Sequence, residues 1–83
     1  MNKLLVEITL AAQGGKYDVS LPADVPVGEL LPALGNLLSE LAPNAFIPTG
    51  DEVLCDGERE RALDENLTLS QQQIRDGSRL ILI

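Results

Sequence analysis

Apolar and polar residues alternate in the first part of the chain. Residues 4–10 place an apolar side chain at every second position, and residues 17–21 repeat this pattern. A period of two is typical of a strand with one buried face. Gln13, Gly14, Gly15 and Lys16 supply a turn between the two runs, so we expect a β-hairpin.

The pattern changes to a helical spacing between residues 26 and 41. The apolar positions 27, 30, 31, 34, 37, 38 and 41 form a stripe wide enough to lie across a sheet. Pro26 suits the first turn of a helix, and Glu29 suits the positive end of its dipole. Pro32 lacks a backbone donor and crowds the carbonyl four residues earlier. We therefore expect a kink near Gly28 or a helix that starts late.

The remaining elements are short. Residues 52–56 predict a strand, and residues 61–63 predict a brief edge strand. Residues 71–73 favour a short helical turn, and residues 79–83 form a closing apolar strand after the Asp76-Gly77 turn.

Length and composition limit the chain to one small unit. At 83 residues it can form one modest core, so we expect a single domain over residues 1–83. Aromatic residues make up only 2% of the chain, which predicts an aliphatic core. Nothing resembles a signal peptide, and no apolar run approaches the ~20 residues that cross a membrane. We expect this segment to be soluble and cytoplasmic, either free-standing or as the cytosolic domain of a membrane-associated complex, with no direct insertion into the membrane.

Charge and missing residue types exclude several functions. Thirteen acidic residues against six basic ones give a net charge of −7, which repels phosphate backbones and anionic lipids. Nucleic acid is therefore not an expected partner. The chain has one Cys and no His, which rules out an internal disulfide and a Ser/His/Asp nucleophile and removes the commonest zinc ligands. We expect no catalytic activity, no cofactor and no metal site.

The later part of the chain resembles ubiquitin. Residues 68–82 read Thr-Leu-Ser-x-x-x-Ile-x-x-Gly-Ser-x-Leu-x-Leu, and they follow a hairpin and one long helix. The resemblance covers essentially the whole chain. It implies the ubiquitin-like β-grasp fold of the α+β class, a mixed sheet with one long helix packed across it. In this fold the last strand lies at the sheet centre, parallel to the first. Leu80 and Leu82 then face the helix, while Leu69 and Ile74 fill one end of the core.

A shorter motif resembles one branch of this superfamily. Residues 21–32 read Leu-Pro-Ala-Asp-Val-Pro-Val-Gly-Glu-Leu-Leu-Pro. This string is similar to the ubiquitin-like domain of the EccD proteins of type VII secretion, which the small YukD/EsaB proteins share. The resemblance implies a component of the system that exports WXG-type substrates, with other secretion-system subunits as partners.

Two alternatives remain open at this point. One is a sulfur carrier or modifier whose Gly-Gly tail is missing from this sequence, which stops at Ile83. The other is a scaffold ubiquitin-like domain of another pathway. The acidic run from Asp51 to Glu65 is also open, because it could dock a basic partner or form a solvated face.

The candidate binding site is a set of apolar residues on the open face of the sheet. Asp56 disfavours a thiolate at Cys55, so Cys55 is expected to be a small core residue beside Val53. Alternation then turns Leu54 toward solvent, and it leaves positions 81 and 83 on the same open face. By resemblance these positions correspond to the hydrophobic patch that partners of ubiquitin bind. A contiguous exposed apolar patch usually marks a binding site. The predicted protein-binding residues are Leu54, Ile81 and Ile83.

Overall fold

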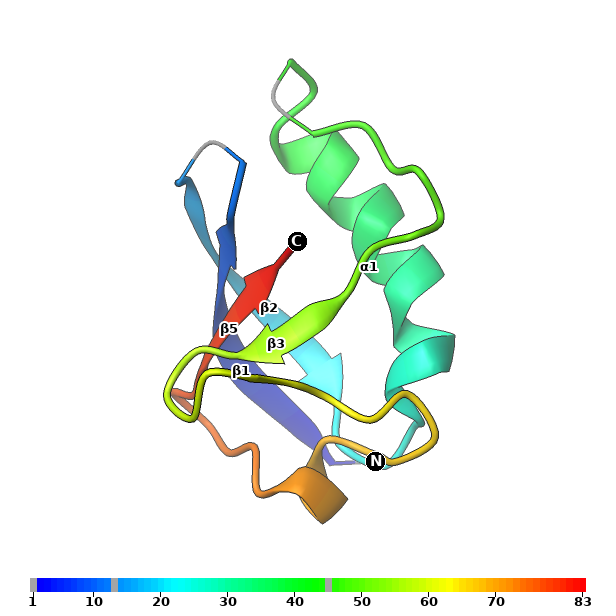
Figure 1. Cartoon of the computed structure of the whole chain (residues 1–83), viewed down its shortest axis with the longest axis vertical. Coiled ribbons are helices and arrows are strands. Elements are labelled where there is room, and N and C mark those ends of the chain that lie inside the picture. Colours follow the sequence, from blue (N-terminus) through cyan, green and yellow to red (C-terminus); the bar gives the residue numbers. More distant parts are fainter. Residues whose placement is uncertain (1, 13, 45) are drawn as a thin grey trace.

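The computed structural model describes residues 2–12, 14–44 and 46–83. Figure 1 shows one long helix lying across one face of a sheet. In chain order the elements are β1 (Lys3–Leu10), β2 (Lys16–Pro22), α1 (Val27–Leu41), β3 (Leu54–Asp56), β4 (Arg61–Ala62), the 3₁₀ helix η1 (Ser70–Gln72) and β5 (Arg79–Leu82). The predicted α+β class and the single long helix are confirmed.

The sheet is mixed, with the strand order β2-β1-β5-β3-β4. β1 pairs antiparallel with β2, and β5 pairs parallel with β1, so that Ile8 lies beside Leu80. The last strand therefore occupies the sheet centre, as predicted. In the hairpin turn the Leu10 amide donates to the Gly15 carbonyl at 2.9 Å. Gln13, where this turn was predicted to begin, lies outside the described residues.

The helix starts at Val27, so the prediction of a late start is wrong. The first amides of a helix have no partner within it. Here the Val27 amide donates to the Leu67 carbonyl and the Gly28 amide donates to the Glu65 carbonyl, both at 2.9 Å. A distant loop thus caps the helix. Pro32 lies within α1 on its exposed side.

The core is aliphatic, as predicted, and lies between α1 and the inner face of the sheet. Leu80 and Leu82 are buried in β5, and Leu69 and Ile74 are buried at one end of the core. Leu37 and Leu41 were expected in the apolar stripe that faces the sheet, but they are 37% and 50% exposed. The other fully buried apolar side chains include Val6, Ile8, Val27, Leu34, Leu38 and Leu54.

The loop that caps the helix is held in place by Gln72. This side chain is buried, and its Oε1 accepts a hydrogen bond from the Asp64 amide at 2.7 Å. Its Nε2 donates to the carbonyls of Asp64 at 3.0 Å and Thr68 at 3.3 Å. A buried amide whose donors and acceptor are all used fixes the backbone around it. Glu65 is therefore held close to the start of α1.

Candidate functional site

The phase predicted for β3 is wrong. Leu54 is only 1% exposed and pairs with Leu82 on the core face of the sheet. Cys55, which was expected in the core, pairs with Ile81 and is partly exposed on the other face. Because side chains alternate along a strand, assigning one residue to the wrong face of the sheet assigns every side chain of that strand to the wrong face. Leu54 therefore cannot belong to a surface site.

The structure brings four apolar side chains together on the open face. Cys55 lies opposite Ile81, and Val53 and Ile83 exchange two backbone hydrogen bonds of 3.1 and 2.9 Å. Residues that exchange both bonds in an antiparallel pair lie directly opposite each other. Ile83 is 67% exposed and Val53 is 37% exposed. We call this set the open-face patch, formed by Val53, Cys55, Ile81 and Ile83. Of the three predicted binding residues, it keeps Ile81 and Ile83.

Polar side chains border the open-face patch. In the register of β1 and β5, Thr9 lies beside Ile81, and Glu7 lies beside Arg79. On the other side, the apolar Ala62 of β4 lies opposite Cys55 and is exposed, so the polar border is on the β1 side. An apolar centre with a polar border is typical of protein interfaces. Val53 and Cys55 were missed because three consecutive apolar residues at 53–55 give no alternation from which to choose a face.

Asp56 stabilises the turn that joins β3 to β4. Its side chain is 2% exposed, and Oδ1 accepts hydrogen bonds from the amides of Glu58 at 2.9 Å and Arg59 at 3.2 Å. Oδ2 forms an ion pair with Arg59 Nη1 at 3.0 Å. Burial raises the pKa of Asp56, but these hydrogen bonds and the Arg59 charge outweigh it, so its pKa is lowered. Asp56 therefore stabilises the fold as a carboxylate.

We expect this carboxylate to make stability pH-dependent. A pKa below the ordinary 3.8 in the folded state means that the stabilisation is present above that value and is lost as pH falls through the folded pKa. Asp56→Asn should therefore destabilise the protein near neutral pH, and the difference should shrink between about pH 5 and pH 2. Urea midpoints of both proteins across this range check the prediction. Parallel curves would contradict it.

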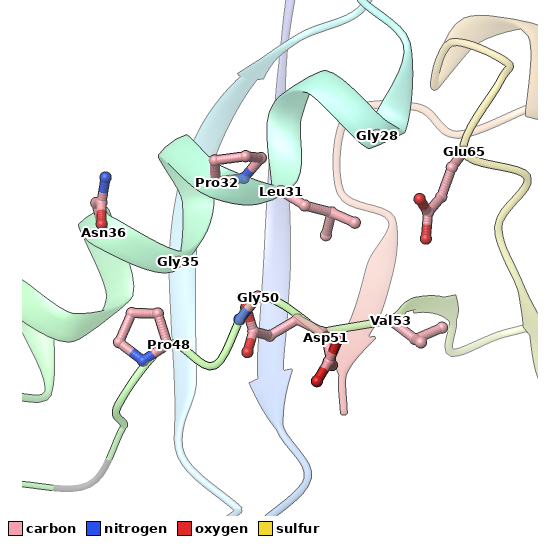
Figure 2. Close-up of a pocket in the computed structure, with 11 residues that line it drawn as sticks. Gly28, Leu31, Pro32, Gly35, Asn36, Pro48, Gly50, Asp51, Val53 and Glu65 are labelled. Atoms are coloured by element: carbon pink, nitrogen blue, oxygen red, sulfur yellow. The ribbon is translucent and has the colours of Figure 1, made fainter.

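A concave surface lies between α1 and residues 48–53, and it shares only Val53 with the open-face patch. It encloses about 510 Å³, and we call it the helix-side pocket. Figure 2 shows Leu31 extending from α1 above the segment that carries Asp51 and Val53, with the Glu65 side chain at the end away from Asn36 and Pro48. The lining residues are Gly28, Leu31, Pro32, Gly35, Asn36, Pro48, Gly50, Asp51, Glu52, Val53 and Glu65.

Two glycines of α1 line this pocket. Gly28 and Gly35 are two helical turns apart and so lie on one side of α1. A Cβ at Gly35 would lie 3.5 Å from the Pro48 Cβ, and a Cβ at Gly28 would lie 3.2 Å from the Glu65 carbonyl oxygen. The first distance is an ordinary van der Waals contact and the second is a tight one, so the missing side chain matters at Gly28, where it leaves room for the capping loop.

The Glu52 carboxylate orders the opposite wall. Its Oε2 accepts hydrogen bonds from the Thr49 hydroxyl at 2.6 Å and the Thr49 amide at 2.7 Å, and Oε1 accepts one from the Gly50 amide at 3.2 Å. These bonds, the Thr49 hydroxyl first, lower the pKa of Glu52. The wall is thus held by internal contacts, and it carries a negative charge.

A smaller apolar cavity of about 300 Å³ lies at the end of β5. It is lined by Leu10, Ala11, Ala12, Phe46, Leu82 and Ile83. Across the described ranges, no group of three His, Cys, Asp or Glu side chains is placed to hold a metal ion. No helix within those ranges has the length and hydropathy needed to cross a membrane.

Comparisons with known proteins identify related chains. The family described as "WXG100 protein secretion system (Wss), protein YukD" matches residues 5–82. The ubiquitin-like domain of the Mycobacterium tuberculosis type VII secretion system protein EccD1 superimposes with a TM-score of 0.82 at 23% identity, covering 100% of this chain and 99% of that one. This similarity confirms the ubiquitin-like fold. No curated protein matches the sequence.

Two further structures are more similar in sequence. The EccD5 ubiquitin-like domain from Mycobacterium xenopi is 28% identical with a TM-score of 0.74, over 100% of this chain and 94% of that one. A chain of the "MycP5-free ESX-5 inner membrane complex" is 27% identical with a TM-score of 0.73. That match covers 100% of this chain but 21% of the other, so the shared part is a small portion of a larger subunit.

Proposed function

Because this chain belongs to the YukD family of the WXG100 protein secretion system, we propose that it is a non-catalytic, protein-binding component of such a system. Support comes from the ESX-5 inner membrane complex, in which a similar segment is part of a membrane-complex subunit. The proposed partners are subunits of the secretion machinery. The proposed location is the cytoplasm, beside the membrane complex.

The observation that carries the proposal is the open-face patch. Its residues alternate along the paired strands with the buried Leu54 and Leu82, so they lie on the face of the sheet opposite the core. Figure 1 shows α1 packed across the other face. Burying exposed apolar area against a partner is favourable by roughly 25 cal/mol per Å². A patch with a polar border can therefore bind a protein surface without any catalytic group.

Ile81→Asp tests this proposal. We expect the variant to remain folded but to lose capture of secretion-system subunits, because a charge at the centre of an apolar contact must be desolvated on binding. The measurement is affinity capture from cells that carry the machinery, with the captured subunits identified by mass spectrometry.

Leu5→Asp is the matched control. Leu5 is 55% exposed in β1, and it precedes the part of that strand that pairs with β5. The same apolar-to-acid change there should leave capture unchanged, and circular dichroism should show both variants folded. A folded Ile81→Asp protein that captures the same subunits as the parent would refute the open-face patch as the binding site.

A further inference from the structure

We infer that the helix-side pocket is a second docking site, which binds an extended basic segment of a partner protein. The segment would place an apolar side chain in the pocket and Arg or Lys side chains at its rim. This inference goes beyond the proposed function, since the helix-side pocket shares only Val53 with the open-face patch and does not depend on partner binding at Ile81.

The charge around the pocket is negative and is not neutralised. Asp51, Glu52 and Glu65 line it, and the lining includes no Lys or Arg. Within the described ranges, the one ion pair joins Arg59 to Asp56. Neither residue lines the pocket, so this ion pair does not neutralise the pocket's carboxylates. The lowered pKa of Glu52 keeps that carboxylate charged. A partner that brings positive charge would therefore be attracted to this rim.

Folding brings these carboxylates together from the two ends of the acidic run. Asp51 and Glu52 belong to one wall, and Glu65 belongs to the loop that caps α1 (Figure 2). Between them in sequence, Asp56 is buried in the β3–β4 turn and makes structural contacts. The acidic run is thus not one solvated face, because its ends meet at a concave surface.

The rest of the lining suits an apolar side chain. Leu31 is partly buried, and Pro32 and Pro48 are exposed, so the pocket offers apolar surface between the carboxylates. Its volume of about 510 Å³ lies within the range of roughly 300 to 1,000 Å³ seen for binding pockets. The hydrogen bonds of Glu52 and the capping bond from the Gly28 amide to Glu65 hold both walls before any partner binds. A preformed site loses less entropy on binding.

The same charge argues against other occupants. A second copy of this chain would also carry a net charge of −7, and nucleic acid would bring its phosphates to the carboxylates. A basic protein segment combines the positive charge and the apolar side chain that this pocket complements.

The test uses a blocked six-residue peptide in which arginine and leucine alternate, titrated into the ¹⁵N-labelled chain. We expect amide shifts at Gly28, Gly35 and Gly50, and we expect binding to weaken as salt is raised. A peptide in which glutamate replaces arginine should not bind, and one in which serine replaces leucine should bind more weakly. Shifts centred on Cys55 and Ile81 instead would overturn the inference.

Two charge-reversal pairs distinguish specific binding at the pocket carboxylates from general attraction to the negative net charge of the protein. Asp51→Lys with Glu65→Lys should lower affinity for the arginine–leucine peptide by about tenfold or more. Glu40→Lys with Glu58→Lys makes the same change in net charge at exposed residues outside the pocket, and it should alter affinity by less than about threefold. Equal losses in both pairs would show non-specific attraction and refute the site. Amide spectra of each variant check its fold, and capture through Ile81 should persist in both pairs.

Discussion

Leu54→Asp is expected to unfold the protein, whereas Cys55→Asp is expected to leave it folded. Leu54 is 1% exposed and packs in the core opposite Leu82. A carboxylate there would lose its hydration without gaining a partner, which should destabilise the fold by more than about 4 kcal/mol. Because small domains are stable by only about 5–15 kcal/mol, such a loss is enough to unfold many of them. Cys55 lies on the open face, where a carboxylate can stay hydrated.

Circular dichroism and thermal melting of the two variants measure this difference. The pair is well matched, since the residues are adjacent in β3 and receive the same new side chain. A folded Leu54→Asp protein together with an unfolded Cys55→Asp protein would show that the phase of β3 is reversed. The open-face patch would then be wrongly assigned.

Leu34→Ala should lower the free energy of unfolding by about 2–5 kcal/mol. Leu34 is 1% exposed at the middle of α1, where it packs between the helix and the sheet. Truncation removes buried apolar surface and leaves a cavity that its neighbours fill only in part. Alanine is also a strong helix former, so the loss measures packing and not helix propensity.

Leu37→Ala is the control on the same helix. Leu37 is 37% exposed, so its truncation should change the free energy of unfolding by less than about 1 kcal/mol. Urea unfolding of the two variants and the parent gives both values. An unchanged midpoint for Leu34→Ala, or a larger loss for Leu37→Ala, would mean that the buried face of α1 is wrongly assigned.

The sequence predicts the long elements well because their patterns repeat. In β1, polar Glu7 and Thr9 alternate with apolar residues, so the phase of the strand is determined. In β3, Val53, Leu54 and Cys55 follow one another without a polar residue between them. Asp56 shares the core face with Leu54, because its hydrogen bonds allow this acidic residue to be buried.

Tertiary contacts explain the other differences. Pro32 predicts a disturbed start of α1. The first amides of α1 instead donate hydrogen bonds to the loop carbonyls of Glu65 and Leu67, and the helix starts at Val27. The helix-side pocket depends on the same loop, so no local pattern predicts it. One available signal was Gly28 within a predicted helix, since such a glycine often allows another segment to approach closely.

Alkylation of Cys55 by a maleimide tests the central claim most directly. This residue is the only cysteine of the chain, and it lies within the open-face patch, partly exposed. If the open-face patch binds secretion-system subunits, the free folded protein should react readily. The same thiol should react at least about tenfold more slowly in the assembled complex, because the partner would exclude the reagent. Equal rates in the free protein and the complex would contradict the proposed interface.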